Sequence, residues 1–513
     1  MSAVMVLGCT SWAGKSLLAT ALCRWYADQG LRVAPFKGQN MSNNARVVAG
    51  GELGVAQWLQ ARAARVVPDV RMGPVLVKPE RDGSQVVVLG RVDDDLSRLA
   101  WTARPAGLWG PISQSLDALL AEHDLVVCEG AGSPAETNLR DTDLANLRVA
   151  AHAGAPALLV ADIDRGGAFA HLLGTWTLVD EVDRHRLAGF VLNKFRGDPT
   201  LLREAPAELT ARTGMAHAGV LPMLAHRLPD EDGARDMADL GPAGSGRVPT
   251  VAVVRYPSAS NLDELTLLAT ASRLVWATTP AAVAEADLVV LPGSKHVGAD
   301  LAWLRATGTG AAVVDRAARG GRVLGVCGGL QVLGQHLGPE PVAGGGEGGG
   351  PGLGLLPVST RYTATKRVGP VDGLRFRVLS GSPWSALDGL VVGGYDIRHG
   401  TTTGDPGGGG GSGSSGSGGA GGGGGAGGSG GAGATGSGVG DGRAAVLGEE
   451  HGWAEGSVLG LACHGVLEDP AVVEALLGVR PVDRLEETLD ALAAAVDEHL
   501  DTDLLRRMTG GLL

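Results

Sequence analysis

The segment VMVLGCTSWAGKSLL at residues 4–18 constrains the fold of this chain more than any other. It consists of a short apolar strand, a loop bounded by Gly8 and Gly14, and a helix that would begin at Lys15. Such a loop holds nucleotide phosphates with backbone N–H groups, a lysine ammonium and the positive end of a helix dipole. Five residues lie between the two glycines, where the standard loop has four. The segment therefore predicts a nucleotide-binding α/β domain that starts with this strand.

Short apolar strands alternate with helical stretches, such as 16–29 and 54–66, through residues 1–238. This alternation predicts a parallel sheet with helices on both faces and ligands at the carboxyl ends of its strands. A second series of strands predicts another domain of the same class. We expect two doubly wound, mostly parallel-sheet α/β domains at 1–238 and 250–480, joined by a linker at 239–249. The expected strands are 4–7, 33–36, 125–128, 157–161, 189–192 and 218–221, then 251–255, 288–291, 323–326 and 458–462.

Two further segments stand apart from these domains. Residues 404–442 are almost wholly Gly, Ser and Ala, which cannot bury enough apolar surface to fold, so a disordered insertion is expected there. Residues 481–513 contain a stretch with helical spacing of Leu and Val, which predicts a C-terminal amphipathic helix that packs on a domain or a partner.

The charge balance and the cysteines limit the classes of function. With 43 basic and 55 acidic residues the net charge is −12, which argues against nonspecific nucleic-acid binding. The 5 cysteines are scattered, as in proteins of a reducing compartment. No signal peptide and no apolar run long enough for a membrane span are visible. We expect a cytoplasmic enzyme without a membrane segment. The sequence is also compatible with a homo-oligomer.

The residues at the first strand ends predict an ATP and Mg²⁺ site. Lys15 would reach the outer phosphates next to Gly14, and the Ser16 hydroxyl would bind Mg²⁺. Glu129, between an apolar strand and a glycine turn, is the expected second metal ligand. Lys37 ends a strand at the same edge and is expected to bind the γ-phosphate or a substrate carboxylate. Asn193 also follows a strand, where either a nucleotide-base or a structural role is open.

Four aspartates lie near the same edge. Asp162 and Asp164 follow another strand. Asp141 and Asp143 lie in TNLRDTDLANL and could face the phosphates, although helix capping is the better explanation of them at this point.

The second domain carries a predicted thiol site. Cys327 lies between an apolar strand and Gly328-Gly329, in the pattern of a nucleophile on a strand-to-helix elbow. The N–H of Gly328 and the backbone of Gly293-Ser294 are the expected oxyanion donors. His464, directly after a strand, is the expected base, and Glu468 is the nearest candidate for an orienting carboxylate. An ATP site and a thiol site in one chain predict a glutamine-dependent amide ligase.

With these motifs in order, the chain resembles the cobyric acid synthase family, over nearly its whole length except the glycine tract. The resemblance rests on VMVLGCTSWAGKS, VAPFKGQNMSNN, DVRMGPVLVKP, CEGAGSPAETNLRDTDL, VADIDRGGAFA, NKFRGD, LPGSKHVGADLAWLR, GVCGGLQVLG and GYDIRHG.

The resemblance implies a dethiobiotin-synthetase-like ATPase domain fused to a class I glutamine amidotransferase domain. It implies amidation of the b, d, e and g carboxylates of adenosylcobyrinic acid a,c-diamide, with L-glutamine as the nitrogen source. ATP would convert each carboxylate into an acyl phosphate, which ammonia released by Cys327 and His464 would attack. It further implies that Asp143 and Asp141 are catalytic and that Glu129 binds Mg²⁺.

The chain departs from the family pattern at two places. Trp12 stands where the family usually has an aspartate, and Gly460–Gly465 lacks the aromatic residue that the family has before its histidine. Two alternatives stay open. One is cobyrinic acid a,c-diamide synthase, which amidates other carboxylates. The other is a partition-type P-loop ATPase without glutaminase activity, which would need no Cys327–His464 pair.

Overall fold

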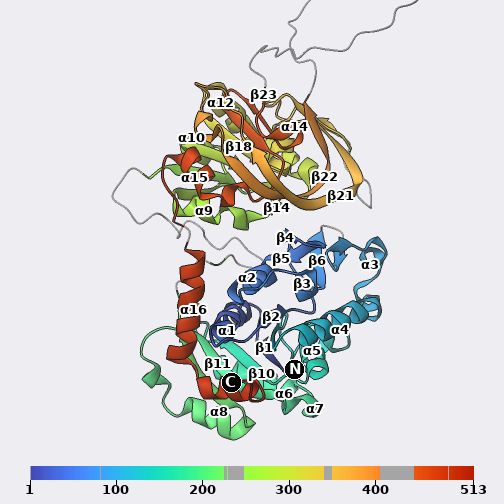
Figure 1. Cartoon of the computed structure of the whole chain (residues 1–513), viewed down its shortest axis with the longest axis vertical. Coiled ribbons are helices and arrows are strands. Elements are labelled where there is room, and N and C mark those ends of the chain that lie inside the picture. Colours follow the sequence, from blue (N-terminus) through green and yellow to red (C-terminus); the bar gives the residue numbers. More distant parts are fainter. Residues whose placement is uncertain are drawn as a thin grey trace, which may run out of the picture.

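The computed structural model describes residues 2–80, 83–224, 228, 248–339, 349–404, 444–482 and 484–513. Two α/β bodies lie one above the other along the long axis of the molecule (Figure 1). The predicted linker at 239–249 lies outside the described residues except for its last two, and the predicted insertion at 404–442 does so except for Gly404.

The lower body contains a six-stranded, all-parallel sheet with the strand order β12-β11-β10-β1-β9-β2. Alternate residues of a strand face opposite sides, so Val4 and Val6 of β1 pack into one core layer and Met5 and Leu7 into the other. Because helices cover both faces, these strands are apolar along nearly their whole length. The strands are β1 (Ser2–Gly8), β2 (Val33–Phe36), β9 (Leu125–Glu129), β10 (Ala157–Asp162), β11 (Leu187–Phe195) and β12 (Ala216–Pro222).

Two sets of helices cover this sheet. One layer contains α1 (Lys15–Asp28), α2 (Val55–Ala63) and the C-terminal helices. The other contains α4 (Pro105–Glu122), α5 (Leu147–Ala153), α6 (Ala168–Leu178) and α8 (Ala205–Thr213), and α3 (Asp94–Arg98) and α7 (Glu181–Arg184) are short.

Small sheets between β2 and α4 were not predicted, and they face the upper body (Figure 1). A hairpin joins β4 (Ala45–Val48) to β5 (Gly51–Gly54). Beside it lies a four-stranded sheet of β3 (Asn40–Met41), β6 (Val75–Glu80), β7 (Gly83–Val88) and β8 (Arg91–Val92).

The upper body contains a seven-stranded sheet in the order β15-β13-β16-β18-β25-β24-β23, in which the first five strands are parallel. This arrangement confirms the predicted fold class of two mostly parallel α/β domains. The strands are β13 (Thr250–Val254), β15 (Arg273–Ala277), β16 (Leu288–Leu291), β18 (Arg322–Val326), β23 (Ala444–Ala445), β24 (Gly452–Glu455) and β25 (Val458–Leu461). The helices are α9 (Thr266–Thr270), α10 (Pro280–Glu285), α11 (Val297–Ala306), α12 (Thr309–Ala318), α13 (Gly328–Leu333), α14 (Gly448–His451) and α15 (Pro470–Leu477).

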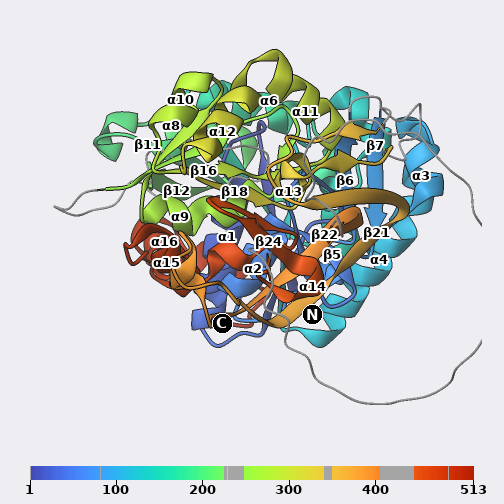
Figure 2. The same cartoon turned by 90° about the horizontal axis from the view of Figure 1, so that it is seen from above.

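The long strands β21 (Val358–Arg375) and β22 (Val391–Gly404) lie along one side of the upper body, beside β19 (His336–Leu337) and β20 (Gly350–Pro351) (Figure 2). A short pair of strands, β14 (Ala259–Ser260) and β17 (Gly293–Ser294), lies close to the lower body.

The C-terminal segment differs from the single helix that was predicted. It forms α16 (Leu485–His499) and α17 (Thr502–Met508), because the chain is extended at Leu500 and Asp501 caps the second helix through Leu504 N–H at 2.9 Å. Both helices pack on α1 of the lower body, where Trp25 Nε1 donates to Asp497 at 2.6 Å. No helix among the described residues is long and apolar enough to cross a membrane.

Candidate active sites

Two side chains at the end of β11 hydrogen-bond the backbone of the phosphate loop. Asn193 Nδ2 donates to Ala13 O at 2.9 Å, and Lys194 Nζ donates to Trp12 O at 2.6 Å. Gly14 has a φ of +102°, and a Cβ at this position would lie 1.9 Å from Asn193 Nδ2. Only glycine fits there without moving the loop. Of the two roles left open for Asn193, these contacts favour the structural one.

Glu129 lies at the centre of a buried polar cluster. Its carboxylate accepts hydrogen bonds from Ser16 Oγ at 2.7 Å, Lys37 Nζ at 3.0 Å and Gln60 Nε2 at 2.5 Å. Burial favours the neutral acid, but Lys37 and the hydrogen-bond donors outweigh it and lower the pKa of Glu129. The buried Gln60 Oε1 has no hydrogen-bond partner among the residues that the structure describes. Because Mg²⁺ takes one or two carboxylates together with hydroxyl, water and phosphate oxygens, Ser16 and Glu129 fit the metal site that the sequence predicted.

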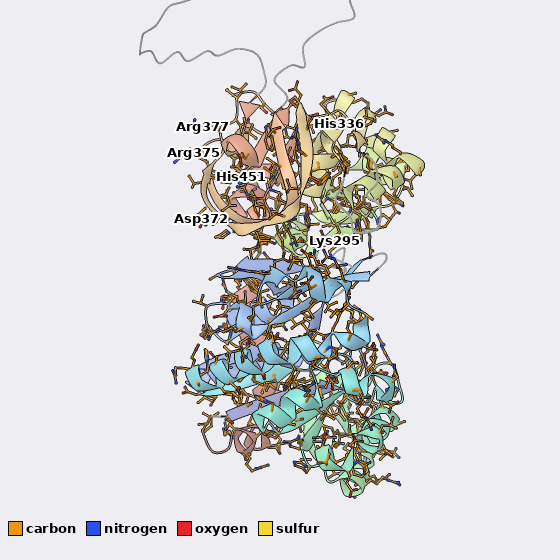
Figure 3. The ribbon with its side chains drawn as sticks, turned by 90° about the vertical axis from the view of Figure 1, so that its right-hand side faces the viewer. Lys295, His336, Asp372, Arg375, Arg377 and His451 are labelled. Atoms are coloured by element: carbon orange, nitrogen blue, oxygen red, sulfur yellow. The ribbon has the colours of Figure 1, made fainter. Side chains whose placement is uncertain are left out.

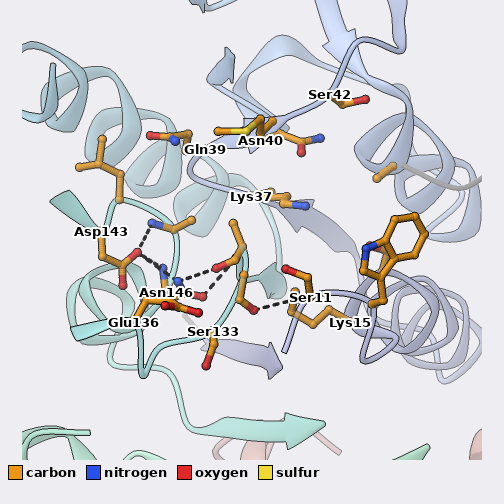
Figure 4. A pocket seen from close by; sticks show the side chains of 18 of the residues that line it. Ser11, Lys15, Lys37, Gln39, Asn40, Ser42, Ser133, Glu136, Asp143 and Asn146 are labelled. Atoms are coloured by element: carbon orange, nitrogen blue, oxygen red, sulfur yellow. Dashed lines mark hydrogen bonds between the residues drawn. The ribbon is translucent and has the colours of Figure 1, made fainter. Parts of the chain in front are cut away.

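A cavity of about 1040 Å³ opens above this cluster (Figure 4). Lys15 and Lys37 lie on its wall, together with the predicted residues Gly14, Ser16, Asp141 and Asp143. Lys15 Nζ donates to Gly132 O at 3.0 Å and to Thr10 O at 3.3 Å. The upper body contributes part of the wall, so the cavity lies between the two domains. That part consists of Arg255, Tyr256, Pro257, Ala259 and Leu262.

The four aspartates have different surroundings. Asp143 Oδ1 accepts hydrogen bonds from Ala145 N and Asn146 N at 2.9 Å each, which is a capping arrangement, and burial raises the pKa of Asp143. Asp141 is exposed on the cavity wall. Asp162 pairs with Lys194 at 2.8 Å, and Asp164 pairs with an exposed arginine, so these two shape the loops beside the phosphate loop.

Cys327 occupies the predicted elbow between β18 and α13. Its φ of +50° is in the left-handed region, which is unusual for a residue with a side chain and occurs often at active sites. Its N–H donates to Leu461 O at 2.7 Å. A Cβ on Gly329 would lie 2.0 Å from Leu291 O, so the turn needs glycine for the helix to pack so closely on β16.

His464 lies against Cys327, and its orienting carboxylate is Glu264. His464 Nδ1 is 2.9 Å from Glu264 Oε1, and the other oxygen accepts from Gly465 N at 3.0 Å. The Cys327 thiol lies near enough to the His464 ring to favour its charged form. Burial opposes the charged imidazolium, but Glu264 and Cys327 outweigh it and raise the pKa of His464 well above its usual range.

The prediction that Glu468 orients the histidine is therefore wrong. Glu468 pairs with Arg46 of the lower body. Glu264 belongs to the short 3₁₀ helix η6 (Leu262–Leu265), which lies 200 positions before His464 in the chain. The available sequence signal was the acidic pair Asp263-Glu264 after the first strand of the second domain, which apolar packing does not explain.

The aromatic residue missing before His464 is supplied by another strand. The Tyr395 ring of β22 stacks on the His464 ring, with 5.6 Å between centroids and an interplanar angle of 21°. Two backbone hydrogen bonds of 2.9 Å join the same two residues. Sequence reasoning missed Tyr395 because this contact depends on a bridge between β22 and the segment that follows β25.

The predicted oxyanion donors come together beside Cys327. A Cβ on Gly328 would lie 2.6 Å from Ser294 N, and one on Gly293 would lie 2.8 Å from His464 Cε1. Ser294 Oγ donates to Asp300 at 2.6 Å, which fixes this loop at the start of α11. The other four thiols do not share this geometry, and burial raises the pKa of each of them; they are Cys9, Cys23, Cys128 and Cys463.

Comparison with known proteins agrees with the division of the chain into two α/β domains. Residues 4–231 match the model of the CobQ/CobB/MinD/ParA nucleotide binding domain, and residues 250–409 match that of the CobB/CobQ-like glutamine amidotransferase domain. The cobyric acid synthase of Variovorax paradoxus (strain S110) is 52% identical over 510 residues, which cover 98% of each chain. That of Paracidovorax citrulli (strain AAC00-1) is also 52% identical, over 97% of each chain. A solved glutamine amidotransferase structure matches 48% of this chain and 98% of its own length, at 17% identity and with a TM-score of 0.28.

Proposed function

This chain belongs to the cobyric acid synthase family, and we propose that its two sites divide one amidation reaction between them. The family places it among the glutamine amidotransferase ligases of cobalamin biosynthesis. The proposed substrate is adenosylcobyrinic acid a,c-diamide, amidated at its b, d, e and g carboxylates with ATP and L-glutamine. The observation that carries the proposal is the cavity above Lys15, because residues of both domains line it.

Glutamine hydrolysis is assigned to Cys327, His464 and Glu264. His464 takes the thiol proton, and the Cys327 sulfur attacks the carboxamide carbon of glutamine. The N–H groups of Gly328 and Ser294 would stabilise the oxyanion. His464 then returns the proton to the leaving nitrogen, which departs as ammonia and leaves a glutamyl thioester. Water hydrolyses the thioester to glutamate and restores the thiol.

Glu264 supports both proton transfers. Its negative charge stabilises the imidazolium, and its contact with Nδ1 leaves Nε2 as the ring nitrogen for proton transfer with the sulfur. Tyr395 packs on the ring face and limits its rotation.

Activation of the carboxylate is assigned to the cavity of the first domain. Lys15 and Lys37 would neutralise the phosphates of ATP, and the oxygens of Ser16 and Glu129 would hold Mg²⁺. The metal ion would supply charge stabilisation at the transferring phosphoryl group. A corrinoid carboxylate oxygen attacks the γ-phosphorus, which gives an acyl phosphate and ADP. Ammonia then attacks the acyl carbon and releases phosphate, a far better leaving group than hydroxide.

The family resemblance implies catalytic roles for Asp143 and Asp141, and the place of both residues on the cavity wall supports this proposal. Asp143 holds the turn at Ala145 and Asn146 and so shapes the wall, whereas the exposed Asp141 can meet substrate directly.

Mass spectrometry of the corrinoid after incubation with Mg²⁺, ATP and glutamine tests this proposal. Four successive exchanges of OH for NH₂ are expected, and C327A should lose them with glutamine and regain them with ammonium. No exchange with either nitrogen donor would refute the amidation. Exchange at the a and c positions of a less amidated substrate would identify the a,c-diamide synthase reaction instead.

A further inference from the structure

A single arginine of the lower domain contacts the elements that carry the glutamine site of the upper domain. Arg46 lies on β4 and is 7% exposed. Its Nη2 lies 2.6 Å from Asp263 Oδ2, and its Nη1 pairs with Glu468. Its guanidinium also packs over the Trp58 ring at 4.7 Å from the centroid. From this geometry we infer that Arg46 is a positioning residue for glutamine hydrolysis, an inference that rests on the proposed function.

The two carboxylates that Arg46 binds lie close in sequence to Glu264 and His464, the proposed orienting carboxylate and base. Asp263 and Glu264 are consecutive in η6, so a shift of Asp263 moves the carboxylate that orients the histidine. Glu468 belongs to another 3₁₀ helix, η8 (Val466–Glu468), which starts two residues after His464. Arg46 therefore ties together the two short turns that hold Glu264 and His464.

A stack of rings forms a second connection. The Arg46 guanidinium lies 5.9 Å from the centroid of the Tyr395 ring, and Tyr395 stacks on His464. The planar guanidinium can pair with two carboxylates and contact aromatic faces at once, which the compact ammonium of a lysine cannot reproduce.

The Asp263 carboxylate is buried, so it needs the positive charge of Arg46 beside it. The Asp263 oxygens accept no hydrogen bond in the described part of the chain, so the ion pair with Arg46 is what compensates this buried carboxylate. Burial raises the pKa of Glu468 to about 7 in spite of Arg46. Without the guanidinium, the buried Asp263 and the partly buried Glu468 would have to take up protons or turn toward water, and either change displaces η6 and η8.

Arg46 is also close in sequence to the wall of the ATP cavity. Residues 39–44 line that cavity and lead into β4, which carries Arg46. Asn261, just before η6, donates from its N–H to Asn44 Oδ1 at 3.2 Å and from Nδ2 to Ala45 O at 3.0 Å. Lys295 lies at the same boundary, where it bonds Asn43 (Figure 3). Ligands that move this wall would thus change the alignment of the glutamine site, and Arg46 provides the mechanical link.

The chain offers a matched control at the same interface. Lys366 of β21 pairs with Glu52 of β5 at 2.7 Å, and Glu52 also bonds Lys78 of its own domain. This second interdomain ion pair involves neither η6 nor η8. Loss of Lys366 therefore weakens docking of the domains without loosening the turns that hold Glu264 and His464.

The test compares full-length R46M, R46K and K366M with the unmodified protein. Glutamate release is measured for kcat, KM and pH dependence, and corrinoid amidation is measured with ammonium. A displacement of about 1 Å costs about a hundredfold in rate, so we expect R46M to lose about that much glutaminase kcat, with a smaller change in KM. R46K should recover only part of the loss. K366M should stay within about threefold of the unmodified protein, because Glu52 keeps its ion pair with Lys78 and is not left as an unpaired buried charge. Ammonium-supported amidation should persist in all three variants.

Two results would overturn the inference. One is glutaminase kcat and pH dependence in R46M that equal those of the unmodified protein. The other is an equal loss in R46M and K366M that extends to ammonium-supported amidation, because this would mean a general loss of folding or docking. The assay of the unmodified protein with ammonium tests the proposed amidation separately, so failure of the one is distinguishable from failure of the other.

Discussion

Replacing Glu264 with glutamine is expected to slow glutamine hydrolysis by about a hundredfold to a thousandfold. Because Nδ1 and Oε1 are 2.9 Å apart, the charge centres lie about 4 Å from each other. Two unit charges at that separation attract by about 4 kcal/mol at an effective dielectric constant of about 20. Losing all of that stabilisation in the transition state would cost about a thousandfold in kcat. Glutamine can still accept a hydrogen bond from Nδ1–H, which sets the lower figure.

The pH dependence gives the prediction a second readout. Glu264 raises the pKa of His464 by stabilising the imidazolium, so its loss lowers that pKa. The form with a charged imidazolium then disappears at a lower pH, and the alkaline limb of the glutaminase profile should move toward neutral pH. Glutamate release from pH 6 to 10 measures this, with E455Q at an exposed strand position as the control. An unchanged kcat and an unmoved alkaline limb in E264Q would show that Glu264 does not orient the histidine.

Three further predictions concern other parts of the chain. G14A should weaken ATP binding by more than tenfold in calorimetry, because the new Cβ would clash with Asn193 and the positive φ would strain the backbone. G30A is the control, since a Cβ there would have open space. It should lose only about 1–2 kcal/mol of unfolding free energy, from backbone strain. K15M should abolish amidation with either nitrogen donor and leave glutamine hydrolysis measurable, which product analysis decides. Because the pKa of Glu468 is raised from 4.5 to about 7, its contribution to stability is full below pH 4.5 and is lost as the pH rises through about 7. E468Q removes this titration. The free energy of unfolding, measured in urea, should therefore depend less on pH over this range in E468Q than in the unmodified protein.

The two parallel sheets could be predicted because each of their strands is a short apolar run that ends in polar or glycine residues. Val33–Phe36 and Leu288–Leu291 have the predicted limits. The antiparallel additions could not be predicted in this way. β4 and β22 mix polar and apolar residues, and their place is decided by contacts between the domains, such as the packing of Ala45 and Leu76 against Ile397.

The site residues divide along similar lines. Cys327, His464 and Ser16 lie in local motifs, in which a glycine turn after a strand marks each of them. Glu264 and Tyr395 carry no such mark, because each reaches His464 only through the folding of distant segments. Glu468 is the carboxylate nearest to His464 in the following sequence, but after the backbone turn at Gly465 it pairs with Arg46 instead.

The return of the C-terminal helices to α1 has a consequence for how the molecule is made on the ribosome. Arg24 of α1 pairs with Glu486 and Asp490, and Tyr26 donates to Leu505 O at 2.9 Å, so α1 is covered only when residues 485–508 have emerged. The nucleotide-binding half is translated first, yet it cannot complete its packing until the whole glutamine amidotransferase half has been translated. A ribosome that stops early therefore releases a nucleotide-binding half with an open apolar face, a target for cellular proteases, in place of a ligase without its amidotransferase domain.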